Sequence, residues 1–275
     1  MAKHKQSDKD VEMSFWEHME ELRWHIVRSV IAVVVLSIIA FLNRKMVFDF
    51  LVLAPGKADF FTNRMLCKAG ELLNIEAICM DDLNLQIINI NMSGQFLTHM
   101  YISFITGLVL AFPFVLNEIW RFVKPGLREG EARYSSGAVF ISSLLFFLGV
   151  LFSYFLIVPL TINFLGTYQV SETVTNQISL QSYISTVISV IFAVGLVFEL
   201  PILIYFLTKI GLITPAFMRR NRKYTIVILL IISAVITPPD VFSQILVVIP
   251  LIALYEMSIL VSDRIARKQS RMEKG

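Results

Sequence analysis

Apolar residues in this chain are gathered into six runs, and polar segments separate each run from the next. A helix needs about 20 mostly apolar residues to cross the hydrocarbon core of a bilayer. The runs predict six membrane-spanning helices, at about 26–42, 95–120, 138–165, 182–207, 224–236 and 241–261. The expected fold is an all-α polytopic membrane protein, with residues 1–275 in a single transmembrane domain.

The fifth run is too short for an ordinary span. At 1.5 Å per residue, 224–236 reaches only about 20 Å, against a hydrocarbon core of about 30 Å. We expect the sixth span, which follows the tight turn at 237–240, to be short as well. Two short spans on one side predict local thinning of the bilayer, at a cost of fractions of a kcal/mol per Å of mismatch.

A different pattern precedes the first run, at 14–25. It opens with a capping box, a hydroxyl at Ser14 and a carboxylate three residues later at Glu17. The next residues are apolar on one helical face and acidic on the other. The apolar face holds Phe15, Trp16, Met19, Leu22 and Ile26, and the polar face holds Glu17, Glu20, Glu21 and His25. This predicts an amphipathic interfacial helix that leads into the first span.

The composition, 56% hydrophobic and 16% charged, excludes a soluble domain of this length. Lys and Arg set the orientation, because cytoplasmic loops carry the excess of them. Of the 24 Lys and Arg residues, all but five lie before residue 29, in 121–133, in 209–223 or after residue 263. We expect both termini in the cytoplasm and an extended outward-facing segment at 43–94. Nucleic-acid binding is not expected, because topology accounts for these basic groups.

The loop at 118–133, EIWRFVKPGLREGEAR, follows the second apolar run and is dense in charge of both signs. It turns at Pro125 and Gly126. In so apolar a chain, this loop is where a soluble ligand can be held at the membrane surface. We expect the other charged cytoplasmic segments to lie around it.

Four motifs occur along the chain in order. They are HMEELR at 18–23, PFVLNEIWRFVKPGLREGEAR at 113–133, GLVFELP at 195–201, and TPPDVFSQ at 237–244 followed by IPLIALYE at 249–256. With six spans and cytoplasmic termini, they resemble the TatC family, the multispanning subunit of the twin-arginine (Sec-independent) protein translocase. The chain departs from the family pattern at Trp24, His25 and Ala132, and its segment 56–90 finds no match.

The resemblance implies a binding and translocation protein and not an enzyme. Such a protein recognises the twin-arginine signal peptides of folded proteins. With the single-span subunits TatA and TatB it transports them across the membrane, driven by the proton motive force. The resemblance also implies a concave bundle in the bacterial cytoplasmic (inner) membrane, in contact with lipid, homo-oligomeric within a receptor complex, and without a cofactor or metal.

Glu21 and Glu131 match the glutamates with which the family recognises the two arginines. A carboxylate accepts the planar fork of a guanidinium in pairs, a geometry that Lys cannot copy. Glu20 and Glu129 are auxiliary acceptors, and Leu22, Arg23, Phe122 and Pro125 are expected to shape the same surface. The alternative is that Glu20 and Glu21 are solvated carboxylates that pair with Arg23, His25 or lipid headgroups.

Glu199 lies inside the fourth span, and an ionisable residue there is a functional-site candidate by default. The resemblance implies that it is a polar contact for TatA and TatB, facing a concave pocket. The alternative is a carboxyl group satisfied inside the bundle by a Ser or Thr of a neighbouring helix. Gln244 and Glu256 are weaker candidates for the same role.

Two other functions remain as alternatives. Glu199 could carry a proton in a secondary transporter that couples proton movement to a small solute, but no internal repeat is evident. An intramembrane hydrolase would need a second acid facing Glu199, and Glu256 is the candidate.

Two cysteines, Cys67 and Cys79, lie in the outward segment. In an oxidising compartment they can form a disulfide, worth about 3 kcal/mol in the chain-entropy model. Two free thiols are the alternative.

Overall fold

The computed structural model describes residues 15–57, 59–73, 86–123, 135–171, 173, 176–237 and 241–272. Five helical segments in this part of the chain are long and apolar enough to cross a membrane: His18–Leu42, Gly94–Val123, Gly137–Thr167, Leu180–Lys209 and Gln244–Arg267. They confirm the prediction of an all-α polytopic membrane protein. The predicted fifth span is a 15-residue helix, α10 (Arg222–Ile236), so a count of six spans stays a prediction.

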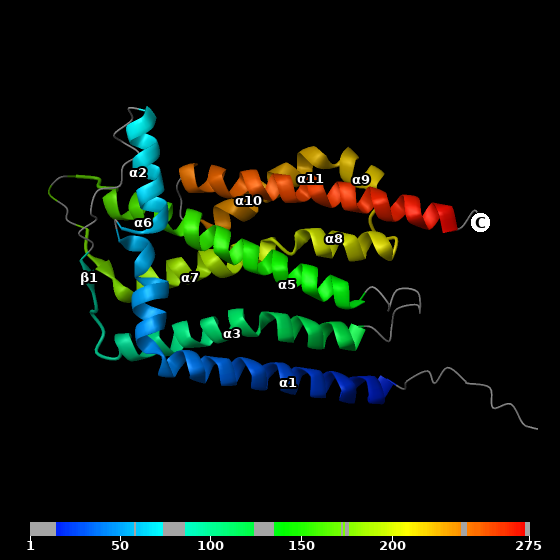
Figure 1. The fold of residues 1–275 in the computed structure, drawn as a ribbon, viewed down its shortest axis with the longest axis horizontal. Coiled ribbons are helices and arrows are strands. Elements are labelled where there is room, and N and C mark those ends of the chain that lie inside the picture. Colours follow the sequence, from blue (N-terminus) through cyan, green and yellow to red (C-terminus); the bar gives the residue numbers. More distant parts are fainter. Residues whose placement is uncertain are drawn as a thin grey trace, which may run out of the picture.

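The helices run largely parallel or antiparallel to one another. They are α1 (Phe15–Leu42), α3 (Gly94–Val123), α5 (Ser135–Phe152), α6 (Val158–Thr167), α7 (Leu180–Val197), α8 (Leu200–Lys209), α9 (Pro215–Arg220), α10 and α11 (Val241–Met272). The start of α1 and the end of α11 lie at the same end of the molecule, on the right of Figure 1. We call this the terminal end; the opposite end carries the 43–94 segment.

Two predicted spans contain interruptions that follow from proline. The fourth span divides into α7 and α8 at Phe198–Glu199, because Pro201 near the start of α8 has no N–H to continue the helix. The third span passes from α5 through the π-helix η5 (Ser153–Ile157) into α6, which has Pro159 in its first turn. Both spans nevertheless remain long enough to cross a bilayer.

The sixth predicted span is not short, which corrects one expectation. α11 has 32 residues and continues past the predicted end at residue 261. Polar contacts to α8 and α9 hold this continuation: the Ser262 and Thr208 hydroxyls are 2.8 Å apart, and Asp263 pairs with Arg219. Hydropathy predicted the end of the apolar run at residue 261, but contacts with α8 and α9 stabilise α11 as a helix beyond that residue.

Small residues allow α1 and α3 to pack closely. Ser103, Gly107 and Ala111 are buried one turn apart along α3. A Cβ atom added at Gly107 would lie 2.5 Å from the backbone nitrogen of Ser37 on α1 and 2.7 Å from its Cα. Any side chain at residue 107 would therefore push the two helices apart, as at other close crossings of membrane helices.

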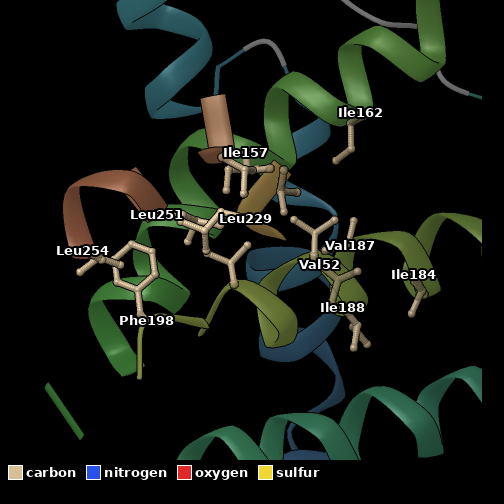
Figure 2. Packing of buried hydrophobic residues seen from close by; sticks show 14 of the residues in the cluster. Val52, Ile157, Ile162, Ile184, Val187, Ile188, Phe198, Leu229, Leu251 and Leu254 are labelled. Carbon is tan, nitrogen blue, oxygen red and sulfur yellow. The ribbon is translucent and has the colours of Figure 1, made fainter. Parts of the chain in front are cut away.

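The main hydrophobic core is centred on α7 and α11. Buried hydrophobic residues from many elements meet there. Figure 2 draws 14 of them and labels Val52, Ile157, Ile162, Ile184, Val187, Ile188, Phe198, Leu229, Leu251 and Leu254. An apolar hollow of about 470 Å³ also lies between α1, α3, α5 and α7, lined for example by Ile39, Val109 and Phe147. Glu199 does not line this hollow, and the concave shape of the bundle stays a prediction.

The described parts of the 43–94 segment, residues 43–57, 59–73 and 86–94, lie at the ends of the spans. It contains a π-helix η1 (Met46–Val52), a 3-10 turn η2 (Ala54–Gly56), α2 (Phe61–Leu73) and the strand β1 (Ile87–Ile88). β1 pairs in parallel with β2 (Ile178–Ser179), and the Tyr183 hydroxyl donates to the Val52 carbonyl at 3.1 Å. The segment therefore contacts β2 through β1 and α7 through Val52.

Candidate functional site

The first predicted site lies at the terminal end, where α1 begins and α3 ends. The two helices are antiparallel there, as Figure 1 shows. Aromatic stacking joins them: the His18 ring on α1 and the Phe122 ring on α3 have centroids 4.4 Å apart and planes inclined by 21°. One surface thus carries residues from HMEELR and from the following motif.

A buried carboxylate, Glu118, lies at the centre of this surface and is only 1% exposed. Its Oε2 atom is 2.7 Å from Nδ1 of His25 and 3.5 Å from a guanidinium nitrogen of Arg28. Its Oε1 atom is 3.4 Å from a guanidinium nitrogen of Arg121. We call these four residues the Glu118 cluster. Three basic neighbours offset the cost of holding a carboxylate away from water.

Glu21 stands next to this cluster. Its Oε1 atom is 4.0 Å from Nε2 of His25, so the imidazole lies between the Glu21 and Glu118 carboxylates. Its Oε2 atom is buried and has no hydrogen-bond partner among the residues that the structure describes. The Glu21 side chain as a whole is 36% exposed, so a ligand from the aqueous side can meet Oε2 once the carboxylate turns outward. One carboxylate oxygen of Glu21 therefore lacks a donor that a bound group could supply.

The other predicted residues divide into three groups. Glu20 is exposed, and its carboxylate is 4.0 Å from the exposed guanidinium of Arg23, an ion pair worth little in water. Leu22 and Phe122 are half-buried and line the surface between the helices. Glu129, Glu131 and Pro125 lie outside the described residues. The structure thus brings Glu21, Glu20 and Phe122 to one surface.

The motifs in the sequence did not identify Glu118, His25, Arg28 or Arg121 as site residues. A signal was present, because Glu118 is an acid near the end of an apolar run and such a group needs a partner. Its main partner, His25, is 93 residues away in sequence. Only the antiparallel packing of α1 on α3 identifies that pair.

The second predicted site is at the break between α7 and α8. The Ser142 hydroxyl on α5 donates a hydrogen bond to Oε2 of Glu199. The other carboxylate oxygen, Oε1, is buried and has no partner among the described residues. A hydroxyl of a neighbouring helix therefore satisfies this carboxyl group only in part.

Gln244 and Glu256 do not join Glu199 in one site. The Gln244 amide donates to the Leu230 carbonyl on α10 at 3.3 Å. Glu256 accepts from the guanidinium of Arg222 at 2.7 Å. Both thus have structural partners between α10 and α11, and no hydrogen bond joins Glu256 to Glu199 among the described residues. The hydrolase alternative therefore gains no support from a direct pairing of the two acids.

The remaining chemistry is limited. No group of three or more His, Cys, Asp or Glu among the described residues could hold a metal ion. Cys67 on α2 is disulfide-bonded, and the other cysteine of the chain, Cys79, lies outside the described residues.

Comparisons with known proteins agree over nearly the whole chain. The family described as Sec-independent protein translocase protein (TatC) matches residues 17–250. The TatC of Blattabacterium sp. subsp. Periplaneta americana is 41% identical over 94% of this chain and 98% of its own. That of Aquifex aeolicus is 35% identical over 96% of this chain and 100% of its own. A crystal structure of the twin arginine translocase receptor TatC in DDM superposes with a TM-score of 0.70 at 35% identity, over 90% of this chain and 99% of that one.

Proposed function

Because the chain belongs to the TatC family of Sec-independent protein translocase proteins, we propose that it is the membrane receptor for twin-arginine signal peptides. The crystallised relative bears the name of a translocase receptor, and it aligns with this chain over almost its full length. The protein is a multi-pass membrane component of protein transport. Its proposed ligand is the pair of arginines that begins the signal peptide of a folded cargo protein.

One observation supports this proposal: Glu21 is a partly exposed side chain whose Oε2 atom has no hydrogen-bond donor among the described residues, and a turn of the carboxylate would present that oxygen to a ligand. A guanidinium donates two parallel hydrogen bonds to a carboxylate, and such charged pairs are stronger than neutral ones. Glu131 is the proposed acceptor for the second arginine, with Glu20 and Glu129 as auxiliaries. Phe122 and Leu22 provide apolar surface beside Glu21.

The proposed receptor works as a scaffold and not as an enzyme. It lies in the bacterial inner membrane with both termini in the cytoplasm, in several copies, and it recruits TatA and TatB. The proton motive force drives transport. Glu199 is the proposed contact for a single-span partner, because its buried Oε1 atom has no hydrogen-bond partner in the described structure and could accept one if the side chain turns towards a docked helix.

Peptide binding to the purified full-length chain in nanodiscs tests the receptor role. A fluorescent Arg-Arg signal peptide is compared with its Lys-Lys counterpart, for the unchanged protein and for Glu21→Gln and Glu131→Gln. Loss of one charged, hydrogen-bonded pair costs about 1.5–3 kcal/mol, so affinity for the Arg-Arg peptide should fall roughly tenfold to hundredfold. Glu71→Gln, an exposed change on α2 at the opposite end, is the matched control.

The proposal fails if the two peptides bind equally, or if Glu71→Gln weakens binding as much as Glu21→Gln. Loss in Glu131→Gln alone would assign recognition to the loop and remove Glu21 from the site.

Co-purification with TatA and TatB tests the partner role of Glu199. We expect Glu199→Gln to reduce the recovered single-span partners, because an amide changes the charge and donor pattern at Oε1. Glu71→Gln, which changes an exposed carboxylate on α2, is the control. Equal recovery in both variants would contradict the role of Glu199.

A further inference from the structure

A second pocket, unrelated to the peptide surface, lies at the opposite end of the molecule. It has a volume of about 440 Å³ and lies among the start of η1, the start of α3 and the start of α7. Arg44, Lys45, Gln95 and His99 are its polar linings, together with one carboxylate, Asp49. The volume is in the range of small-ligand sites.

The pocket lies at the level where three spans end. The apolar segments stop at Leu42 for α1, Gly94 for α3 and Leu180 for α7, and the polar linings follow directly. The edge of the apolar part of a span marks the boundary between hydrocarbon and headgroups. The pocket is therefore at the depth of lipid phosphates.

Its electrostatics favour an anion. Neither Arg44 nor Lys45 pairs with a carboxylate among the described residues, so both charges are available. α3 and α7, of 30 and 18 residues, both begin here, and the start of a helix carries a partial positive charge. The backbone N–H groups of Gln95 and Phe96 also lack partners in the described structure, as first-turn groups usually do.

His99 adds a buried polar group to this pocket, a feature that basic residues at the end of a span do not usually have. Its ring stacks on Phe41, with centroids 4.1 Å apart and planes inclined by 14°, and meets Phe48 edge-on at 5.5 Å. Its Nε2 atom is buried and has no hydrogen-bond partner among the described residues. The two phenylalanine rings thus hold the His99 imidazole in a pocket that Arg44 and Lys45 also line.

We propose that this pocket binds the phosphate group of an anionic phospholipid, with Arg44 and Lys45 as the charged ligands. Gln95 and the first-turn N–H groups of α3 add hydrogen-bond donors, and His99 adds one when its Nε2 atom carries the proton and the ring turns towards the pocket. Basic pockets between membrane helices bind such headgroups in this way. A lipid held there would join α1, α3 and α7 at the end opposite the peptide surface. The inference does not depend on signal-peptide recognition.

Native mass spectrometry of the full-length protein in detergent tests the site. Phosphatidylglycerol and phosphatidylcholine are titrated separately, against the unchanged protein and the double variant Arg44→Gln, Lys45→Gln. The double variant Arg64→Gln, Lys68→Gln is the matched control, because it removes the same charges from exposed positions of α2 in the same segment. Inorganic phosphate and glycerol 3-phosphate form a third arm.

We expect the unchanged protein to retain phosphatidylglycerol in preference to phosphatidylcholine. Affinity should fall roughly fivefold for each cation removed at residues 44 and 45, which is about 1 kcal/mol per cation near an anionic lipid surface. The control variant should bind as the unchanged protein does. Thermal unfolding without added lipid should be the same for both double variants, because all four side chains are exposed.

Equal retention of the two lipids, or equal loss in both double variants, would overturn the proposal. If inorganic phosphate binds with the same dependence on both cations and the lipid adds nothing, the site is one for soluble phosphate, and the lipid assignment is wrong.

Discussion

At the scale of single residues, the Glu118 cluster is the most consequential feature that the structure reveals. A carboxylate 2% exposed at its side chain would be costly on its own, but His25, Arg28 and Arg121 surround it. The departure from the family pattern at His25 lies within this cluster. His25 also lies between Glu118 and Glu21. The Glu118 cluster therefore holds the residue that contacts Glu21, the proposed acceptor for the peptide.

Removal of the Glu118 carboxylate should therefore destabilise the protein. We expect Glu118→Ala to lower the free energy of unfolding by about 3 kcal/mol, the lower end for breaking a buried pair, because Arg28 and Arg121 are half-exposed and can turn to water. Thermal unfolding in detergent measures the change. Glu20→Ala, which removes an exposed carboxylate from the same surface, should change stability by less than about 0.5 kcal/mol. Similar losses in the two variants would contradict a structural role for the cluster.

At the scale of elements, the pairing of α1 with α3 organises the peptide surface. Most of the outward face of α1 is apolar and exposed, as expected of a helix in contact with lipid. Its inner face packs on α3, along the buried small residues Ser103, Gly107 and Ala111. The position of Glu21 relative to Glu118 and Phe122 thus depends on how closely the helices approach at Gly107.

A methyl group at Gly107 should separate the two helices. Overpacking of this kind costs about 1–3 kcal/mol, and we expect Gly107→Ala to lower both the thermal stability and the affinity for an Arg-Arg signal peptide. Gly137→Ala is the control, because a Cβ atom there has no neighbour within 4 Å. The control should be neutral or slightly stabilising, since Ala is the better helix former. Unchanged peptide binding in Gly107→Ala would show that the surface tolerates movement of α1.

At the scale of the whole molecule, the thickness of the bundle is uneven. α10 has 15 residues, about 22 Å of helix, whereas the five long segments have 24 to 31 residues. The length of α11 confines the mismatch to the side of α10, in contrast to the pair of short spans expected from hydropathy.

We predict that the bilayer is thinner beside α10 than beside α1. A helix shorter than the hydrocarbon core would leave its polar ends in hydrocarbon, and thinning of the bilayer around it relieves this mismatch at modest cost. Electron cryomicroscopy of the protein in nanodiscs would measure the distance between headgroup layers on both sides of the same particle. A uniform thickness around the bundle would rule out this role for α10.

What the sequence determined by itself was the class of protein, the approximate spans and the motifs. Burial in a bilayer depends on local hydropathy, and four motifs in order suffice to resemble a family. The contacts between distant segments, by contrast, follow from the packing of the helices: His25 with Glu118, Ser142 with Glu199, and Arg222 with Glu256. The tertiary structure also decided the full length of α11. These depend on which helix faces pack together and in what register, and that is set by the shapes of side chains from several helices at once.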